Sequence, residues 1–382
     1  MLALVAKNIG NGNGASLSAL DVLVSLGQSE SDIKLIHTYK NNLPTELDGK
    51  KIRFSQSFIS PRKINSLQGF TFKVLINKIV EPMLLNRLSK INPDMALINS
   101  LGSHSLWIPI KEKFNWPSTL IIRESPNLYN DIDVILHRFK YYDYFIFVSN
   151  IVRNKWLEYN VIEKEKSYYI PNCVWEEKIA NISKLSKAEV KKKLFGENDN
   201  FLSICTGEIK DRKGQDLIIK NLKEICNLIQ NFKLILLGRG NQVFINKLNK
   251  ILLNLGLKEK VKFIQHQPNA IEYIYAADVL LQPSRSEALP RTILEAMALK
   301  TPIIASDVDG IPELVEDGIS AILFSISNLD KMIQGIHKIY SDNKYKQKLT
   351  ENASKRYWRY FSRENHIQKF AHFLKQTQRS NA

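Results

Sequence analysis

Two carboxylates, Glu287 and Glu295, form a Glu-x7-Glu pattern around the start of a predicted helix. The apolar run Asp278–Gln282 predicts a buried strand, and Pro290 favours a helix from Pro290 to Leu299. A helix N-terminus at the carboxyl end of a parallel strand binds anions. Carboxylates accept hydrogen bonds from sugar hydroxyls. An anion site flanked by two such carboxylates suits a nucleotide sugar.

A structural explanation of the same residues stays open. Thr292 and Glu295 have the S/T-x-x-E spacing of a helix capping box, in which both side chains serve only to hold the helix start.

A second charged segment follows another predicted strand. Phe201–Thr206 is apolar, and it is followed by Gly207-Glu208-Ile209-Lys210-Asp211-Arg212-Lys213-Gly214. Lys213 and Arg212 offer positive charge to a phosphate at the same crevice. Because Glu208 would be repelled by a diphosphate, we expect its side chain to turn away. The alternative is a solvated charged turn without a ligand.

The elements that position these residues form two series of alternating strands and helices. Such alternation indicates α/β architecture with doubly wound parallel sheets. The first series has predicted strands at Leu2–Ala6, Asp32–Thr38, Met95–Asn99, Ser118–Ile122 and Tyr144–Val148. The second has them at Phe201–Thr206, Lys233–Leu237, Val261–Ile264, Asp278–Gln282, Pro302–Ala305 and Ala321–Phe324.

The segment SRSEALPRTILEAMALKTPIIASDVDGIPELVEDG resembles the nucleotide-sugar-binding segment of glycosyltransferase family 4, whose members are retaining enzymes of GT-B fold. The resemblance implies two Rossmann-like domains facing a cleft. By the same resemblance, Glu287 contacts the donor sugar and Glu295 the ribose, and Glu287 and Lys213 are the expected catalytic residues. The other residues implied to bind the donor are Leu289, Arg291, Thr292, Gly207, Arg212, Lys213, Arg239, Gly12 and Gly14.

The resemblance also divides the chain. We expect an acceptor-side domain over residues 1–172, a nucleotide-sugar-binding domain over 173–355, and a C-terminal helix over 356–382 that crosses back to the first domain. The aromatic stretch Tyr357–Phe361 is the expected crossing. Packing of that helix on the second domain alone is the alternative.

Two features of the family need separate treatment here. Family members often carry His-Asp where this chain has Arg123-Glu124, so the acceptor-side base is not assigned. The Asp131-Ile132-Asp133 and Asp307-Val308-Asp309 triplets have the D-x-D spacing of metal-dependent glycosyltransferases of another fold, but neither fits a ligand cluster. We therefore expect no metal and no other cofactor. His266, near the expected base-binding loop, is equally consistent with a surface residue.

Composition limits the remaining choices. The chain has 382 residues, of which 44% are hydrophobic and 24% charged, as is typical of a soluble protein with two full cores. Three cysteines make no disulfide framework and favour a reducing compartment. No apolar run predicts a membrane span, and the apolar N-terminus is interpreted as a first strand. We expect a cytoplasmic protein, peripheral on the inner face of a membrane.

The net charge of +16 favours an anionic partner. Lys50–Lys90 carries nine basic residues interleaved with phenylalanines and a single acid, Glu81, and its apolar positions from Gln68 to Lys90 have helical spacing. Such a segment is typical of contact with an anionic membrane. A helix packed on the core with a solvated basic face is the alternative, and an acidic soluble acceptor would suit the same cations.

Taken together, these patterns predict a retaining, metal-independent glycosyltransferase that moves a sugar from a nucleotide diphosphate to a glycan, lipid-linked or other hydroxyl acceptor. A sugar-nucleotide epimerase of the same fold is the second interpretation. A nucleic-acid-binding protein is the third. It is prompted by the net charge and by the basic segment interleaved with phenylalanines. No motif for binding nucleic acid is present, and no nucleic-acid partner is expected.

Overall fold

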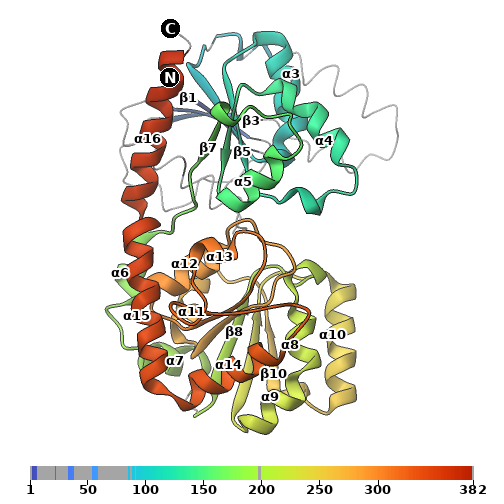
Figure 1. Ribbon diagram of the computed structural model, residues 1–382, viewed down its shortest axis with the longest axis vertical. Coiled ribbons are helices and arrows are strands. Elements are labelled where there is room, and N and C mark those ends of the chain that lie inside the picture. The colour runs from blue at the N-terminus through green and yellow to red at the C-terminus, as the bar shows by residue number, and fades with distance from the viewer. Residues whose placement is uncertain are drawn as a thin grey trace. The chain divides into compact units, whose positions relative to one another are not determined.

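A computed structural model describes residues 2–6, 22, 33–37, 54–58, 85–86, 88–90, 92–196 and 199–380. It divides into two compact units (Figure 1). Unit 1 comprises Met1–Asn172 together with His366–Ala382, and unit 2 comprises Cys173–Asn365. The glycine-rich turn with Gly12 and Gly14 lies outside the described residues. So does most of Lys50–Lys90, including the greater part of its expected helix.

Unit 1 is built on a seven-stranded sheet in the order β3-β2-β1-β4-β5-β6-β7, and every pairing is parallel. Its strands are β1 (Leu2–Ala6), β2 (Ile33–His37), β3 (Phe54–Phe58), β4 (Met95–Asn99), β5 (Ser118–Ile122), β6 (Tyr144–Phe147) and β7 (Ser167–Tyr169). Its helices include α3 (His104–Phe114), α4 (Ile132–Arg138) and α5 (Asn150–Leu157). Central strands β4 and β5 are buried on both faces, as expected for a parallel sheet covered by helices.

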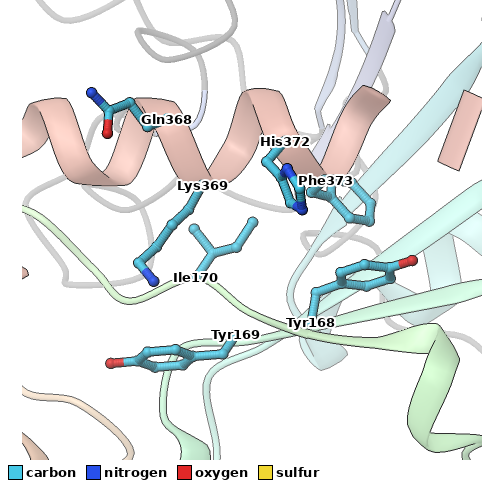
Figure 2. A pocket seen from close by; sticks show the side chains of 7 residues that line it. All are labelled: Tyr168, Tyr169, Ile170, Gln368, Lys369, His372 and Phe373. Carbon is cyan, nitrogen blue, oxygen red and sulfur yellow. The ribbon is translucent and has the colours of Figure 1, made fainter. Parts of the chain in front are cut away.

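The last helix, α16 (Arg363–Ser380), enters unit 1 at His366. Nδ1 of His366 donates to the carbonyl oxygen of Pro171 at 2.7 Å. Phe373 packs edge-on against Tyr168 of β7, with ring centroids 4.9 Å apart. The helix thus covers the sheet edge that β7 would otherwise expose. A shallow hollow of about 300 Å³ remains between them (Figure 2), and the Lys369 ammonium lies over the ring of Tyr169 there.

The chain therefore joins the first unit at His366. The expected crossing at Tyr357–Phe361 is wrong, because those residues lie in unit 2, where the Tyr357 hydroxyl donates to Glu176 at 3.1 Å. Two of their aromatic side chains, Tyr357 and Phe361, are buried in the packing of unit 2.

Unit 2 has a six-stranded parallel sheet in the order β10-β9-β8-β11-β12-β13. Its strands are β8 (Phe201–Thr206), β9 (Phe232–Leu237), β10 (Val261–Ile264), β11 (Val279–Gln282), β12 (Ile303–Ser306) and β13 (Ile322–Phe324). Its helices are α6 (Glu176–Ile182), α7 (Lys187–Phe195), α8 (Gln215–Lys220), α9 (Leu222–Leu228), α10 (Gln242–Leu255), α11 (Ala270–Ala276), α12 (Arg291–Ala298), α13 (Ile311–Leu314), α14 (Asp330–Ser341) and α15 (Asn343–Tyr360).

The strand order of unit 2 reverses direction between β8 and β11. From β8 the chain proceeds outward to β9 and β10, and then returns to β11 on the other side of β8. This is a topological switch point, where open α/β sheets bind ligands beyond the carboxyl ends of the strands. The loop after β8 and the loop after β11 therefore meet at the carboxyl edge of the sheet.

Candidate active site

The loops that follow β8 and β11 are in direct contact. Gly214 has a left-handed φ of +69°, and a Cβ placed there would lie 1.9 Å from the carbonyl oxygen of Pro283. Only glycine fits this position without displacing backbone. The backbone N–H of Arg285 also donates to the carbonyl oxygen of Arg212 at 2.8 Å. These contacts hold Arg212 and Lys213 against the segment that carries Glu287.

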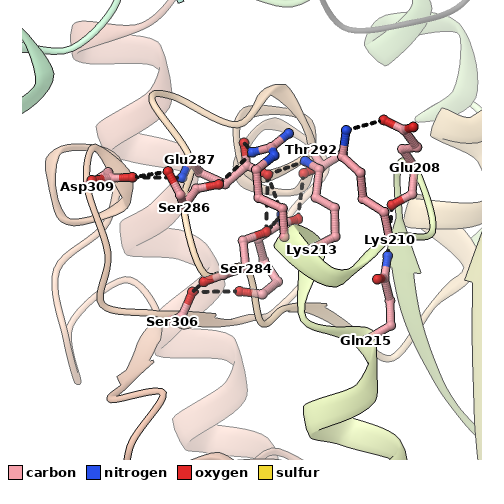
Figure 3. A network of polar contacts seen from close by, with 12 residues as sticks. Glu208, Lys210, Lys213, Gln215, Ser284, Ser286, Glu287, Thr292, Ser306 and Asp309 are labelled. Atoms are coloured by element: carbon pink, nitrogen blue, oxygen red, sulfur yellow. Dashed lines mark hydrogen bonds and ion pairs between the residues drawn. The ribbon is translucent and has the colours of Figure 1, made fainter. Parts of the chain in front are cut away.

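Glu287 is the centre of a buried polar network at this junction (Figure 3). Only 7% of the residue is exposed. Its Oε1 accepts from Ser284 Oγ at 3.1 Å and from Gln282 Nε2 at 3.3 Å, and it forms an ion pair with Lys213 Nζ. The guanidinium of Arg212 lies 3.6 Å from Oε2. The two cations predicted from the sequence thus converge on the predicted sugar-binding carboxylate.

The ionisation of Glu287 follows from these contacts. Burial alone raises the pKa of a carboxyl group, because it removes water from the charged form. Lys213, Arg212 and the hydroxyl of Ser284 outweigh burial and hold the pKa of Glu287 below its usual range. Glu287 is therefore an anion at neutral pH, available as a hydrogen-bond acceptor.

The backbone of Glu287 is held by the loop after β12. Oδ2 of Asp309 accepts from Ser286 Oγ at 2.5 Å and from the backbone N–H of Glu287 at 3.1 Å. The N–H of Gly310 in turn donates to the Glu287 carbonyl oxygen at 3.1 Å. Asp309 adopts φ +44°, a left-handed conformation that aspartate tolerates better than most residues.

Helix α12 begins one residue later than the sequence pattern predicts. Pro290 has an extended ψ of 122° and stands before the first helical residue, Arg291. The capping-box interpretation of Thr292 is wrong. The Thr292 hydroxyl donates instead to Gln282 Oε1 at 2.9 Å, which leaves the Gln282 amide group to face Ser284 and Glu287. A chain of hydrogen bonds therefore connects α12 to the carboxylate.

A second ion pair joins the same two loops. Arg285 contacts the buried carboxylate of Asp216 on α8 with both terminal nitrogens, at 2.8 and 2.9 Å. Lys220 adds a contact of 3.1 Å. Burial opposes ionisation of Asp216, but the two cations hold its pKa below the usual range. The pair fixes the β8–α8 loop relative to the β11–α12 loop.

Glu208 and Gly207 occupy the start of the β8–α8 loop. The Glu208 carboxylate lies 2.5 Å from Lys210 Nζ, on the side of the network away from Asp309 (Figure 3). This is the orientation expected of a carboxylate that would repel a diphosphate. Gly207 has φ +125°, and a Cβ there would lie 3.8 Å from Lys213 Nζ, so a bare backbone adjoins the lysine.

The other predicted donor-binding residues lie around this centre. Glu295 is half-buried on α12, Leu289 and Arg291 are buried beside its start, and Arg239 is exposed in the loop after β9. His266 is half-buried, and burial together with the nearby Arg239 lowers its pKa.

In unit 1 the Arg123-Glu124 pair follows β5. Nε of Arg123 donates to Asn99 Oδ1 at 2.6 Å, and its guanidinium also contacts the side chain of Asn172. Glu124 accepts from Ser100 Oγ and from the backbone N–H of Arg123, each at 3.1 Å. The residues that replace the family's His-Asp thus form an ordered polar cluster at the carboxyl ends of β4 and β5.

One aspartate of each D-x-D triplet makes a structural contact. Asp131 accepts from the N–H of Val134 at the start of α4, and Asp309 holds the Glu287 backbone. Within the described ranges, no three His, Cys, Asp or Glu side chains are grouped to hold a metal ion. In the same part of the chain, no helix combines the length and apolarity needed to cross a membrane.

The match to a known protein family lies in unit 2. Residues 186–356, which lie within unit 2, match the family described as Glycosyl transferases group 1. An uncharacterized glycosyltransferase of Methanocaldococcus jannaschii is 26% identical over 72% of this chain and 68% of its own length. The lipopolysaccharide core biosynthesis glycosyltransferase LpsE of Rhizobium meliloti is 27% identical over 45% of this chain and 49% of its own.

Among solved structures, Anabaena HepE in complex with UDP-glucose superposes with a TM-score of 0.80 at 19% identity, covering 98% of this chain and 100% of that one. Two parallel, doubly wound α/β units and this likeness define the GT-B fold. With the family match over residues 186–356, they support a glycosyltransferase of GT-B fold.

Proposed function

We propose that this protein is a retaining glycosyltransferase that moves a sugar from a nucleoside diphosphate sugar to a hydroxyl of a glycan or lipid-linked acceptor, without a metal or other cofactor. The observation that carries the proposal is the buried Glu287 carboxylate, paired with Lys213 and bordered by Arg212 at the start of α12. One small region thus offers a carboxylate that accepts hydrogen bonds from sugar hydroxyls and cations that bind phosphate.

Each part of the donor has a partner in this arrangement. The diphosphate is anionic and suits Lys213, Arg212 and the N-terminus of α12. The hydroxyls of the transferred sugar suit the Glu287 carboxylate, and those of the ribose suit Glu295. Backbone N–H groups near Leu289, Arg291 and Thr292 complete the diphosphate and sugar contacts, while Gly207 and Arg239 border the donor.

The ion pair between Lys213 and Glu287 indicates how the donor enters. A diphosphate competes with Glu287 for Lys213, and Ser284 and Gln282 retain the carboxylate when the ammonium turns to the phosphate. The contacts to Asp309 keep the Glu287 backbone in place during this exchange. The site is thus preorganised for a charge that grows on the leaving group.

In the reaction, the bond between the anomeric carbon and the β-phosphate oxygen breaks, and a bond to the acceptor oxygen forms on the same face of the sugar. The acceptor proton passes to a phosphate oxygen of the leaving diphosphate. Lys213, Arg212 and the α12 N-terminus stabilise the negative charge that develops there. No side chain is needed as a nucleophile.

The relatives support a role in cell-surface polysaccharide or glycolipid synthesis. LpsE acts in lipopolysaccharide core biosynthesis, and HepE is crystallised with UDP-glucose. We extend this to the cellular setting. The protein is cytoplasmic and peripheral on a membrane that presents the acceptor, and Lys50–Lys90 is one contact with anionic lipid.

Charge reversal at Lys73 and Lys78 is expected to weaken sedimentation with anionic vesicles while donor binding stays intact.

The test is donor turnover followed by proton NMR of the anomeric signal. Incubation with a panel of nucleoside diphosphate sugars is expected to release nucleoside diphosphate from one donor, with water as the acceptor. The released sugar should first appear with the anomeric configuration of the donor. Release with the inverted configuration refutes retention. Formation of an isomeric nucleotide sugar, without release of nucleoside diphosphate, would instead show an epimerase.

A further inference from the structure

The exposed face of α15 forms a basic stripe that the sugar-transfer site does not use. Helix α15 packs on unit 2 with Leu349, Ala353 and Tyr357, which are buried at helical spacing. The stripe is the opposite face and consists of Lys344, Lys348, Glu351, Lys355, Trp358 and Arg359, all exposed. At 100° per residue these positions fall within one side of the helix. The stripe runs about 22 Å along the helix axis.

The charge of the stripe is strongly unbalanced. Four of its six members are cations, and Glu351 is the sole acid of α15. The two other cations of the helix are placed differently: Lys346 is half-buried, and Arg356 pairs with Glu316. Single exposed lysines on a helix need no explanation, but four cations aligned along one face create a continuous positive potential.

The stripe ends in exposed aromatic side chains. Trp358 is 48% exposed and Tyr360 is 44% exposed. The guanidinium groups of Arg356 and Arg359 lie over the Tyr360 ring, 5.5 and 5.1 Å from its centroid. The other four tryptophans of the chain, Trp107, Trp116, Trp156 and Trp175, are buried. One large amphipathic ring is therefore left in water beside arginines.

We propose that the α15 stripe docks unit 2 on an anionic lipid bilayer. Lysine and arginine are attracted to anionic headgroups, and tryptophan and tyrosine favour the headgroup level, where the ring is buried and its polar atom stays wet. A soluble polyanion would satisfy the cations but gives no reason for an exposed indole at the end of the stripe. The surface consists of residues of unit 2 alone, separate from Lys50–Lys90, and it does not depend on the sugar-transfer site.

Vesicle co-sedimentation tests this surface. The full-length protein is expected to sediment with phosphatidylcholine vesicles that contain phosphatidylglycerol at low salt, and to stay in solution with phosphatidylcholine alone. Each stripe lysine contributes about fivefold to the partition coefficient. The variant Lys344→Gln/Lys348→Gln/Lys355→Gln should therefore bind on the order of a hundredfold more weakly.

A matched control separates the stripe from net charge. Lys223, Lys247 and Lys250 are exposed on α9 and α10, and changing all three to Gln removes the same charge from another part of unit 2. This control should sediment like the wild type. Equal binding by the stripe variant and the control overturns the proposal, as does a loss of binding confined to charge reversal at Lys73 and Lys78.

Tryptophan emission supplies a second measurement. Because Trp358 alone among the five tryptophans is exposed, anionic vesicles should shift the emission of the wild type to the blue and leave Trp358→Phe unshifted. Binding to dextran sulfate but not to vesicles, with the same dependence on the three lysines, would assign the stripe to an anionic polymer and refute the lipid proposal. Donor-induced thermal stabilisation is expected to be the same in all stripe variants.

Discussion

Replacing Lys213 by alanine tests the centre of the proposed site. Lys213 is the cation that pairs with the buried Glu287, and in the proposed reaction it also meets the diphosphate. Its removal should therefore affect both catalysis and stability. Lys210 is the matched control, because it lies in the same loop and pairs with the exposed Glu208.

The effect on catalysis follows from the lost phosphate contact. A hydrogen bond to a charged group contributes about 1.5–3 kcal/mol. The loss therefore corresponds to a fall of about ten- to 150-fold in kcat/KM for the donor. Lys210→Ala should stay within a few-fold of the wild type, since an exposed ion pair contributes about 0–1 kcal/mol.

The effect on stability depends on pH. Removing one partner of a buried ion pair costs about 3–5 kcal/mol, and Lys213→Ala should cost less, about 2 kcal/mol, because Arg212, Ser284 and Gln282 remain. In the wild type the depressed pKa of Glu287 contributes stability at neutral pH that is lost as the pH falls through the folded-state pKa. In the variant burial dominates and the pKa rises, so the stability gap should narrow on acidification.

Initial-rate kinetics and urea unfolding at several pH values measure these effects. Adding Glu287→Gln to Lys213→Ala should restore stability at neutral pH, because a neutral amide needs no cation, but it should not restore activity. A folded Lys213→Ala protein with wild-type kcat/KM would remove Lys213 from the active site. A stability gap that is unchanged between neutral and acidic pH would refute the charge argument.

Three further predictions concern the same loops. Glu295→Gln should raise the donor dissociation constant with little change in kcat, while Glu287→Gln should mainly lower kcat, because only the sugar contacts change as the bond breaks. Steady-state kinetics measures both effects, and the reversed pattern would mean that the two residues have exchanged roles. Gly214→Ala should lower the free energy of unfolding by more than about 2 kcal/mol and reduce activity, because its Cβ would meet the Pro283 carbonyl. Gly256 has φ +65° with open space around it, so Gly256→Ala should lower the free energy of unfolding by only about 1 kcal/mol. Equal losses for the two variants in urea unfolding would contradict the loop contact. Turnover should persist in EDTA, and a loss that manganese or magnesium reverses would show a metal-dependent enzyme.

The second unit illustrates what sequence patterns predict well. All six of its strands were predicted within one or two residues, because they are short apolar runs bounded by turn residues, as in Phe201–Thr206. In unit 1, β3 was not predicted. Its sequence, Phe54-Ser-Gln-Ser-Phe58, has apolar residues only at the two ends, and the surrounding basic charges dominated the pattern. The strand β7 was also missed, because its three residues, Ser167-Tyr168-Tyr169, contain no aliphatic side chain.

The site was predicted in its residue types but not in its contacts. Glu287 and Lys213 are 74 positions apart, and their meeting depends on β8 and β11 being neighbours, which no local pattern encodes. Gln282, Ser284 and Asp309 were not assigned to the site. Gln282 is a polar residue at the end of an otherwise apolar strand, and that was the available signal. Asp309 stands in a D-x-D triplet in the sequence, whereas its structural contact is the Glu287 backbone.

The most direct test of the central claim is a thermal-shift titration of the wild type, Lys213→Ala and Glu295→Gln with UDP-, GDP-, ADP- and dTDP-sugars. A ligand at 100 times its dissociation constant stabilises the folded state by about 2.7 kcal/mol, or about 5–10 °C for a unit of this size. We predict such a shift in the wild type with at least one donor, and a clearly smaller shift with that donor in both variants. No shift with any nucleotide sugar, or an equal shift in all three proteins, would contradict a donor site at Lys213, Glu287 and the start of α12.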